Sequence, residues 1–133
     1  MAENRRKEAA AMYDTFEQFE EWLDSYLCDG LPEEIVAVNI NIYETDDPEL
    51  FELQMIGSSE YDPDDPDWAC SEEFTTGEDV FELSASDEDE CLVRCGGLLQ
   101  EYLECGGYAA VLLSLGAVTY GFVDGDLETV FEK

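Results

Sequence analysis

The feature that most constrains this chain is the near absence of positive charge over almost its whole length. The 133 residues include 35 Asp and Glu but only 5 Lys and Arg, for a formal net charge of −30. Arg94 is the one cation between Glu8 and Glu132, and this segment holds 34 acids (all except Glu3), so its net charge is −33. Few of these carboxylates can have a lysine or arginine partner within the molecule, so they must repel one another.

High charge combined with ordinary hydrophobicity indicates a folded acidic domain. Disordered chains of high charge normally lack the apolar residues that a core needs, whereas this chain is 45% apolar and 12% aromatic. The sequence shows no internal repeat and no linker long enough to divide it, so we predict a single domain over residues 1–133. Residues 1–12, MAENRRKEAAAM, are polar and rich in alanine, and we predict that they form a frayed start.

Apolar side chains at helical spacing predict three helices. The first follows Thr15, which can cap its start, and ends at Gly30. Its apolar face consists of Phe16, Phe19, Leu23, Tyr26 and Leu27. The second is predicted to begin at Ser86, followed by four acids that complement the positive helix end. Its apolar face consists of Leu92, Cys95, Leu99, Tyr102 and Leu103. Residues 108–115, YAAVLLSL, predict a short buried helix.

Alternating apolar and polar residues predict strands in the first half of the chain. Residues 34–44 alternate as in a half-buried strand. One face carries Val36, Val38, Ile40 and Ile42, and the other carries Ala37, Asn39 and Asn41. Residues 49–57 alternate again, and we predict that these two segments form an antiparallel pair. Residues 67–74 and 79–85 are candidates for the third and fourth strands.

The C-terminal segment predicts a β-hairpin. Asp124 and Gly125 lie between alternating apolar residues, a pattern typical of a two-residue type I′ turn. With that turn, Tyr120 faces Thr129, and Val118 faces Phe131 on the same side of the hairpin. The element order predicts an α+β domain with an antiparallel sheet of four to six strands, two or three helices packed on one face, and a C-terminal hairpin.

The sequence carries no catalytic signature. It contains no histidine, so the commonest general base and the Ser-His and Cys-His pairings are missing. Phosphate loops and dinucleotide-binding fingerprints are also missing. Paired carboxylates can hydrolyse glycosidic bonds, but among 35 acids such a pair has no specificity as a signal. We therefore predict a non-enzymatic protein without a cofactor.

The cysteines and the N-terminus predict a cytoplasmic protein. The five cysteines are an odd number, form no CxxC pair, and have no histidine to complete a mixed zinc site. The start of the chain lacks the apolar region of a secretory signal, and no apolar run approaches the length of a membrane span. We expect reduced thiols, mostly buried as small apolar residues. They are Cys28, Cys70, Cys91, Cys95 and Cys105.

The sign of the charge restricts the partners. It repels nucleic acids and anionic membranes, so we expect neither to be bound directly. A basic protein or a cation is attracted instead. Self-repulsion destabilises a compact acidic chain, which favours a functional use of the field. Solubility alone is the alternative explanation. The oligomeric state is not determined by the sequence.

The segment from Glu60 to Phe74, EYDPDDPDWACSEEF, is the candidate partner-binding surface. Acids around an aromatic residue suit the capture of a basic protein. The predicted binding residues are Asp62, Asp64, Asp65, Asp67, Trp68, Glu72 and Glu73. Asp and Pro are also ordinary turn residues, so a solvated turn is the alternative. The tryptophan can equally be a core residue of the third strand.

Calcium is a further possible ligand of the same aspartates. Carboxylate oxygens are the ligands that calcium prefers, but the EF-hand loop needs a glycine at its sharp turn. Here Pro66 interrupts the acidic run, and no glycine lies within it. We therefore predict no dedicated metal site, and a weak divalent-ion site stays open.

In its size, acidity, α+β pattern and lack of catalytic residues, the chain resembles, as a class, the small immunity proteins of bacterial toxin–immunity systems. The resemblance implies a protein that binds a cognate toxin, often a basic nuclease, and blocks its active site or substrate groove. It carries over no binding residues, because such proteins use different surfaces for different toxins. The alternatives are a phage-type nucleic-acid mimic that inhibits a DNA-binding protein, and an acidic divalent-cation-binding domain.

Overall fold

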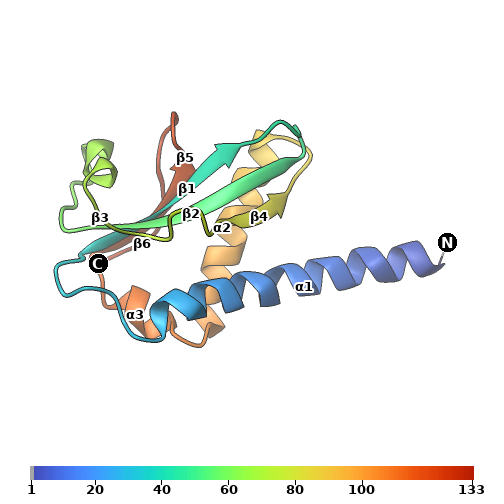
Figure 1. The fold of residues 1–133 in the computed structure, drawn as a ribbon, viewed down its shortest axis with the longest axis horizontal. Helices are drawn as coiled ribbons and strands as arrows, with labels where there is room; N and C mark the ends of the chain where they lie inside the picture. The colour runs from blue at the N-terminus through green and yellow to red at the C-terminus, as the bar shows by residue number, and fades with distance from the viewer. Residues whose placement is uncertain (1) are drawn as a thin grey trace.

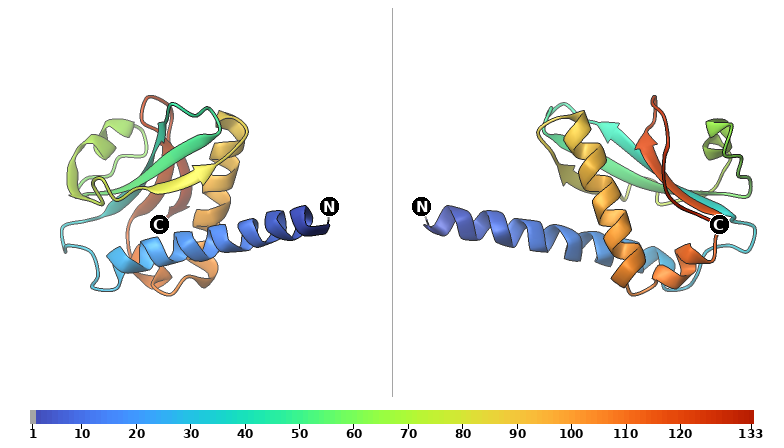
Figure 2. Two further views of the ribbon diagram at one scale, coloured as in Figure 1. Left: turned by 45° about the vertical axis from the view of Figure 1, so that its right-hand side comes forward. Right: turned by 180° about the vertical axis from the view of Figure 1, so that it is seen from behind.

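The computed structural model describes the backbone of residues 2–133 and the side chains of residues 15–133. Within these residues, three helices lie against one face of a six-stranded sheet, and a 3-10 helix, η1, lies against the other (Figures 1 and 2). The helices are α1 (Ala2–Leu27), η1 (Pro66–Cys70), α2 (Glu88–Cys105) and α3 (Ala109–Leu113). The strands are β1 (Ala37–Glu44), β2 (Leu50–Ser58), β3 (Glu72–Thr75), β4 (Phe81–Ser84), β5 (Ala117–Phe122) and β6 (Glu128–Glu132).

The sheet is mixed, so the α+β class is confirmed but the prediction of an antiparallel sheet is wrong. The strand order is β3-β2-β1-β5-β6. β4 also pairs with β2, along the first half of β2, whereas β3 pairs with its last residues. β1 and β2 form the predicted antiparallel pair, whereas β1 and β5 are parallel, with Val38 opposite Val118. Between β4 and β5 the chain passes through α2 and α3, which return it to the starting end of β1. Such a crossover is what a parallel neighbour requires.

The helical face carries the main core. On α1, Phe19, Leu23 and Leu27 are at most 1% exposed, as the spacing predicts. The helix begins at Ala2 rather than near Thr15, and its first half extends past the sheet (Figure 1). Nothing in the described structure tests the prediction of a frayed start over residues 1–12, and it stays a prediction.

The start of α2 differs by one residue from the prediction. Asp87, not Ser86, is the N-cap, and its carboxylate accepts a hydrogen bond from the Glu90 N–H at 2.8 Å. Ser86 instead donates its hydroxyl to the Glu90 carboxylate at 2.8 Å. The predicted apolar face is confirmed, because Cys95, Leu99 and the other inward residues of α2 are buried in the core.

The opposite face of the sheet is also covered, so β1 is buried on both sides and not half-buried. Asn39 is 1% exposed and Asn41 is 9% exposed. The reason is the position of β1 at the centre of the sheet, with the segment around η1 across this face (Figure 2). Trp68 of η1 packs there with Ala37 and Ala117. We call this the loop face, as opposed to the helical face.

The C-terminal hairpin forms, but with a different turn and register. The Gly125 N–H bonds to the Phe122 carbonyl at 3.0 Å, and among residues 2–133 positive φ angles occur only at Gly30 and Gly77. A type I′ turn at Asp124 is therefore wrong, since it needs positive φ at both central residues. Val118 faces Phe131 as predicted, but a bulge after it places Tyr120 opposite Glu128.

All five cysteines are free, and three of them are exposed, so the prediction of mostly buried thiols is wrong. Cys91 and Cys95 lie in the core, while Cys28, Cys70 and Cys105 reach solvent. Burial raises the pKa of the Cys91 thiol to about 12. None of the described helices combines the length and the hydrophobicity that crossing a membrane would take.

Candidate functional site

The acidic segment predicted to bind a partner forms a compact loop whose aromatic side chains face the sheet. We call residues 59–71 the acidic loop. Trp68 is 5% exposed and is buried against the loop face. Tyr61 packs edge-on against Trp68, with 5.2 Å between ring centroids, and donates its hydroxyl to Glu132 of β6. The loop is thus attached to three strands of the sheet, β1 and β5 through Trp68 and β6 through Tyr61.

One buried hydroxyl joins the start of the acidic loop to η1. The Ser58 Oγ donates to the Trp68 carbonyl at 3.1 Å and accepts from the Glu60 N–H at 3.0 Å. At the far end, the Ser71 Oγ donates to the Glu60 carboxylate at 3.2 Å. Close ends and inward side chains are the properties of an Ω-loop, a compact type of surface loop that is frequently functional.

The aspartates of the loop divide into two groups. Asp62 accepts from the Asp64 N–H at 2.9 Å, and Asp65 accepts from the Asp67 N–H at 3.0 Å. These two side chains hold consecutive turns, as the turn interpretation predicts. Asp64 and Asp67 contribute only their backbone N–H groups to these turns, and their side chains are exposed. The same segment therefore forms two turns and exposes a dense group of carboxylates.

The structure separates the predicted binding residues into an exposed set and one buried residue. The exposed residues are Asp62, Asp64, Asp65, Asp67, Glu72 and Glu73. Trp68 points inward, so of its two alternatives the structure shows the core position, although in η1 rather than in a third strand. The ring positions the loop and is not accessible as an interface anchor. The third strand begins only at Glu72.

Two open cavities lie beside the acidic loop, toward the β5–β6 hairpin. The larger has a volume of about 340 Å³ and reaches the polar side chains of β1. The smaller has a volume of about 260 Å³ and is lined by Tyr61, Asp62 and the β5–β6 hairpin. Pro66 and Leu127 line both cavities, so the two openings share an apolar boundary.

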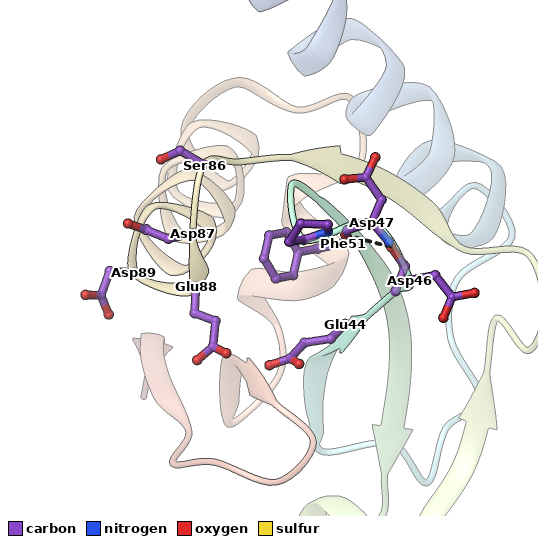
Figure 3. A pocket seen from close by; sticks show the side chains of 10 residues that line it. Glu44, Asp46, Asp47, Phe51, Ser86, Asp87, Glu88 and Asp89 are labelled. Carbon is purple, nitrogen blue, oxygen red and sulfur yellow. Dashed lines mark hydrogen bonds between the residues drawn. The ribbon is translucent and has the colours of Figure 1, made fainter.

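A second acidic surface, which the sequence did not indicate, lies between the β1–β2 turn and the start of α2. We call it the acidic cleft; its volume is about 530 Å³. Its acids are Glu44, Asp46, Asp47, Asp87, Glu88 and Asp89. Figure 3 shows Glu44 and Glu88 pointing toward each other from different elements. A hydrogen bond with Glu44 and the charge of that carboxylate raise the pKa of Glu88 above its usual range.

The acidic cleft was missed because its halves are far apart in the sequence. Thr45-Asp46-Asp47 precedes β2, whereas Asp87, Glu88 and Asp89 begin α2. The second run indicates helix capping, which Asp87 does perform. In the first run, Asp47 accepts a hydrogen bond from the Glu49 N–H at 2.9 Å, as expected of a turn. A turn signal of this kind does not indicate that the run faces the start of a helix.

The two cations among the described side chains do not neutralise these surfaces. The Arg94 guanidinium donates to the Ser84 carbonyl, and the Lys133 Nζ donates to the Ser114 carbonyl at 3.0 Å. Some carboxylates instead accept hydrogen bonds from tyrosine hydroxyls: Tyr102 donates to Asp24 at 2.6 Å. Burial, together with the bond to a carboxylate, raises the pKa of such tyrosines, and that of Tyr61 reaches about 12. Most of the negative charge is left facing solvent.

Neither metal geometry nor comparison with known proteins adds a function. Among the described side chains, no three cysteines or acids are arranged to hold a metal ion. No protein-family model matches this chain, and comparisons with curated proteins and with solved structures give no match either.

Proposed function

We propose that this chain is a non-enzymatic binding protein that neutralises a basic protein partner by covering its functional surface. An immunity protein against a bacterial toxin, such as a nuclease, is the setting that these features favour. One observation carries the proposal. Six exposed carboxylates lie on or beside a loop that a buried tryptophan holds against the sheet, within a segment of net charge −33.

The attachment of the acidic loop to the sheet favours the loop, rather than the acidic cleft, as the partner-binding surface. A binding surface that is already ordered loses less conformational entropy when a partner arrives. The loop is ordered by Trp68, by the Tyr61–Glu132 bond and by Ser58. Both acidic surfaces add to the long-range field, which accelerates the approach of a basic partner. The loop adds cavities with apolar walls, which a docked partner can fill.

The other two hypotheses stay predictions. A nucleic-acid mimic would use the same field, and its partner would release DNA when this protein binds. A divalent-cation binder would melt at a higher temperature in millimolar calcium, and monovalent salt of equal ionic strength would not reproduce the rise. No arrangement among the described side chains favours either hypothesis over the basic-protein partner.

The test compares charge reversal at the two acidic surfaces. The protein would be incubated with basic proteins from its source organism, and an equimolar complex would be isolated and assayed for loss of the partner's activity. The loop variant carries D64K and D67K in the acidic loop, with E72K and E73K in the adjoining strand β3. The control variant carries E44K, D46K, E88K and D89K in the cleft, with the same change in charge.

We expect the loop variant to associate at least about tenfold more slowly than the cleft variant, with a weaker salt dependence. The loop set spares Asp62 and Asp65, whose side chains hold the turns, so the fold of the loop should survive. Equal slowing by both variants would remove the loop from consideration. Absence of any equimolar inhibitory complex would overturn the proposed function.

A further inference from the structure

The larger cavity beside the acidic loop combines three kinds of surface in one place. Its floor is polar and comes from Asn41 and Tyr43 of β1. Its walls include Pro66, Ala69 and Leu127. Its acids are Asp67 and Glu72, both exposed. At about 340 Å³ the cavity lies near the lower end of the range typical of small-ligand pockets.

The floor is a fixed chain of side-chain hydrogen bonds. The Asn39 amide donates to the Asn41 Oδ1 at 2.6 Å, and the Asn41 amide donates to the Gln54 Oε1 at 3.2 Å. The Tyr43 hydroxyl donates to the same Gln54 oxygen at 3.0 Å. These bonds determine the orientation of both amides. They also leave a lone pair on the Asn41 Oδ1 and on the Tyr43 hydroxyl oxygen for a further donor.

These surfaces match the parts of an arginine side chain. The aliphatic stem of arginine can lie along apolar walls while its charged end stays near water. The guanidinium has several N–H donors in one plane. They can bond to the Asn41 Oδ1 and to the carboxylates of Asp67 and Glu72. It also stacks on aromatic rings, and Tyr43 supplies such a ring to the cavity. A lysine ammonium is a compact, strongly hydrated charge and uses fewer of these features.

We propose that this cavity takes an arginine side chain of the basic partner and acts as the specific contact within the wider acidic surface. The inference rests on the proposed function, since the partner supplies the arginine. The carboxylates at Asp67 and Glu72 exclude an anionic ligand. The segment net charge of −33 gives the cavity its preference for a cation.

The test uses three small probes with the full-length protein: the N-acetyl methylamides of arginine, lysine and citrulline, at constant ionic strength. Binding would be followed by NMR through the side-chain amide of Asn41 and the ring of Tyr43. We expect the arginine probe to saturate these signals. The lysine probe should bind more weakly, and citrulline, which is uncharged and nearly the same shape, should bind most weakly.

Matched variants separate the cavity from the general field. D67N/E72Q removes the two cavity acids, and E17Q/E101Q removes two exposed acids from α1 and α2, on the helical face. D67N/E72Q should weaken arginine binding by about threefold to tenfold, as expected for partly exposed charged hydrogen bonds. E17Q/E101Q should leave the binding almost unchanged.

Three results would overturn the inference: no saturable binding at Asn41, equal binding of arginine and lysine, or equal weakening in the two variants. The same variants, assayed in the partner complex, keep the two proposals distinguishable. If a basic partner is bound and inhibited equally by D67N/E72Q and E17Q/E101Q, the arginine contact fails and the proposed function stands. If the arginine probe binds but no inhibitory complex forms, the proposed function fails.

Discussion

The acidic loop and the acidic cleft carry similar numbers of exposed carboxylates but differ in what lies beneath them. In the loop, Trp68 and Tyr61 face the sheet, and two aspartates hold turns. In the cleft, two chain segments bring Glu44 and Glu88 together without a cation between them. Charge density alone therefore does not describe an acidic surface. The carboxylates of the ordered loop are exposed to solvent, whereas the two opposed carboxylates of the cleft disfavour each other's charge.

The strongest test of this comparison is removal of the side chain that holds the loop. Trp68→Ala deletes a buried ring from between the loop and strands β1 and β5, and large-to-small changes of this kind cost about 3–5 kcal/mol. Urea unfolding would measure the loss. The matched control, Val93→Ala, changes a residue that is 74% exposed on α2 and should alter stability by less than about 0.5 kcal/mol. A loss of similar size in both variants would mean that the ring does not stabilise the loop.

A smaller effect is expected from the second attachment of the loop. Tyr61→Phe keeps the ring against Trp68 but removes the hydroxyl that donates to Glu132. Because this bond is exposed, we expect a loss near the lower limit for a hydrogen bond, about 0.5 kcal/mol. Tyr108→Phe is the control, since that side chain is exposed and gives no hydroxyl bond in the described structure.

The contribution of Tyr61 also has a defined pH dependence. Burial first, and then the bond to Glu132, raise the pKa of Tyr61 to about 12, above the usual value of about 10. A raised tyrosine pKa gives stability that is fully present below pH 10 and is lost as the pH rises through 12. The difference in stability between wild type and Tyr61→Phe should therefore be constant from pH 7 to pH 9 and shrink above pH 10. A difference that grows above pH 10 would contradict this.

The smallest effect is expected in the acidic cleft, and its sign is opposite. Glu88→Gln removes one of the two opposed carboxylates while keeping a group that can donate to Glu44. We expect a higher melting temperature at pH 7. The rise should be smaller than the fall in melting temperature that Tyr61→Phe causes. Because the folded-state pKa of Glu88 is raised, its unfavourable charge acts above that pKa and vanishes below the unfolded value of about 4.3.

Melting temperatures measured from pH 4 to pH 8 would test this prediction. The gain from Glu88→Gln should disappear as the pH falls toward 4. Glu34→Gln, at an exposed position before β1, removes the same charge and controls for the general reduction of repulsion. If both variants gain equally at every pH, the pair in the cleft has no special repulsion and the two acidic surfaces are equivalent.

Local signals in the sequence predicted the individual elements well. The helical spacing of Phe19, Leu23 and Leu27 gave the buried face of α1, and the alternation after Pro48 gave β2. The acids after Ser86 indicated the start of α2 to within one residue. Each of these signals depends on neighbours along the chain, so no long-range contact was needed to interpret it.

The candidate site was predicted only in part. The turns at Asp62 and Asp65 agree with the alternative interpretation of this run, because aspartate and proline favour turns locally, while its prediction as a partner surface stays a prediction. The inward direction of Trp68 could not be predicted, since it depends on a sheet face that only forms when β1 and β5 pair. The same parallel pairing buries Asn39 and Asn41, which the alternation had placed on an open face.

The charge, the lack of histidine, the positions of most helices and strands, and the exposure of the acidic segment can all be read from the chain. The parallel pairing of β1 with β5, the burial of the second sheet face, the opposition of Glu44 and Glu88, and the cavity next to Asp67 depend on how distant segments pack. Periodicity indicates only which side of an element is apolar. It does not record which distant element covers that side or the direction in which the two run.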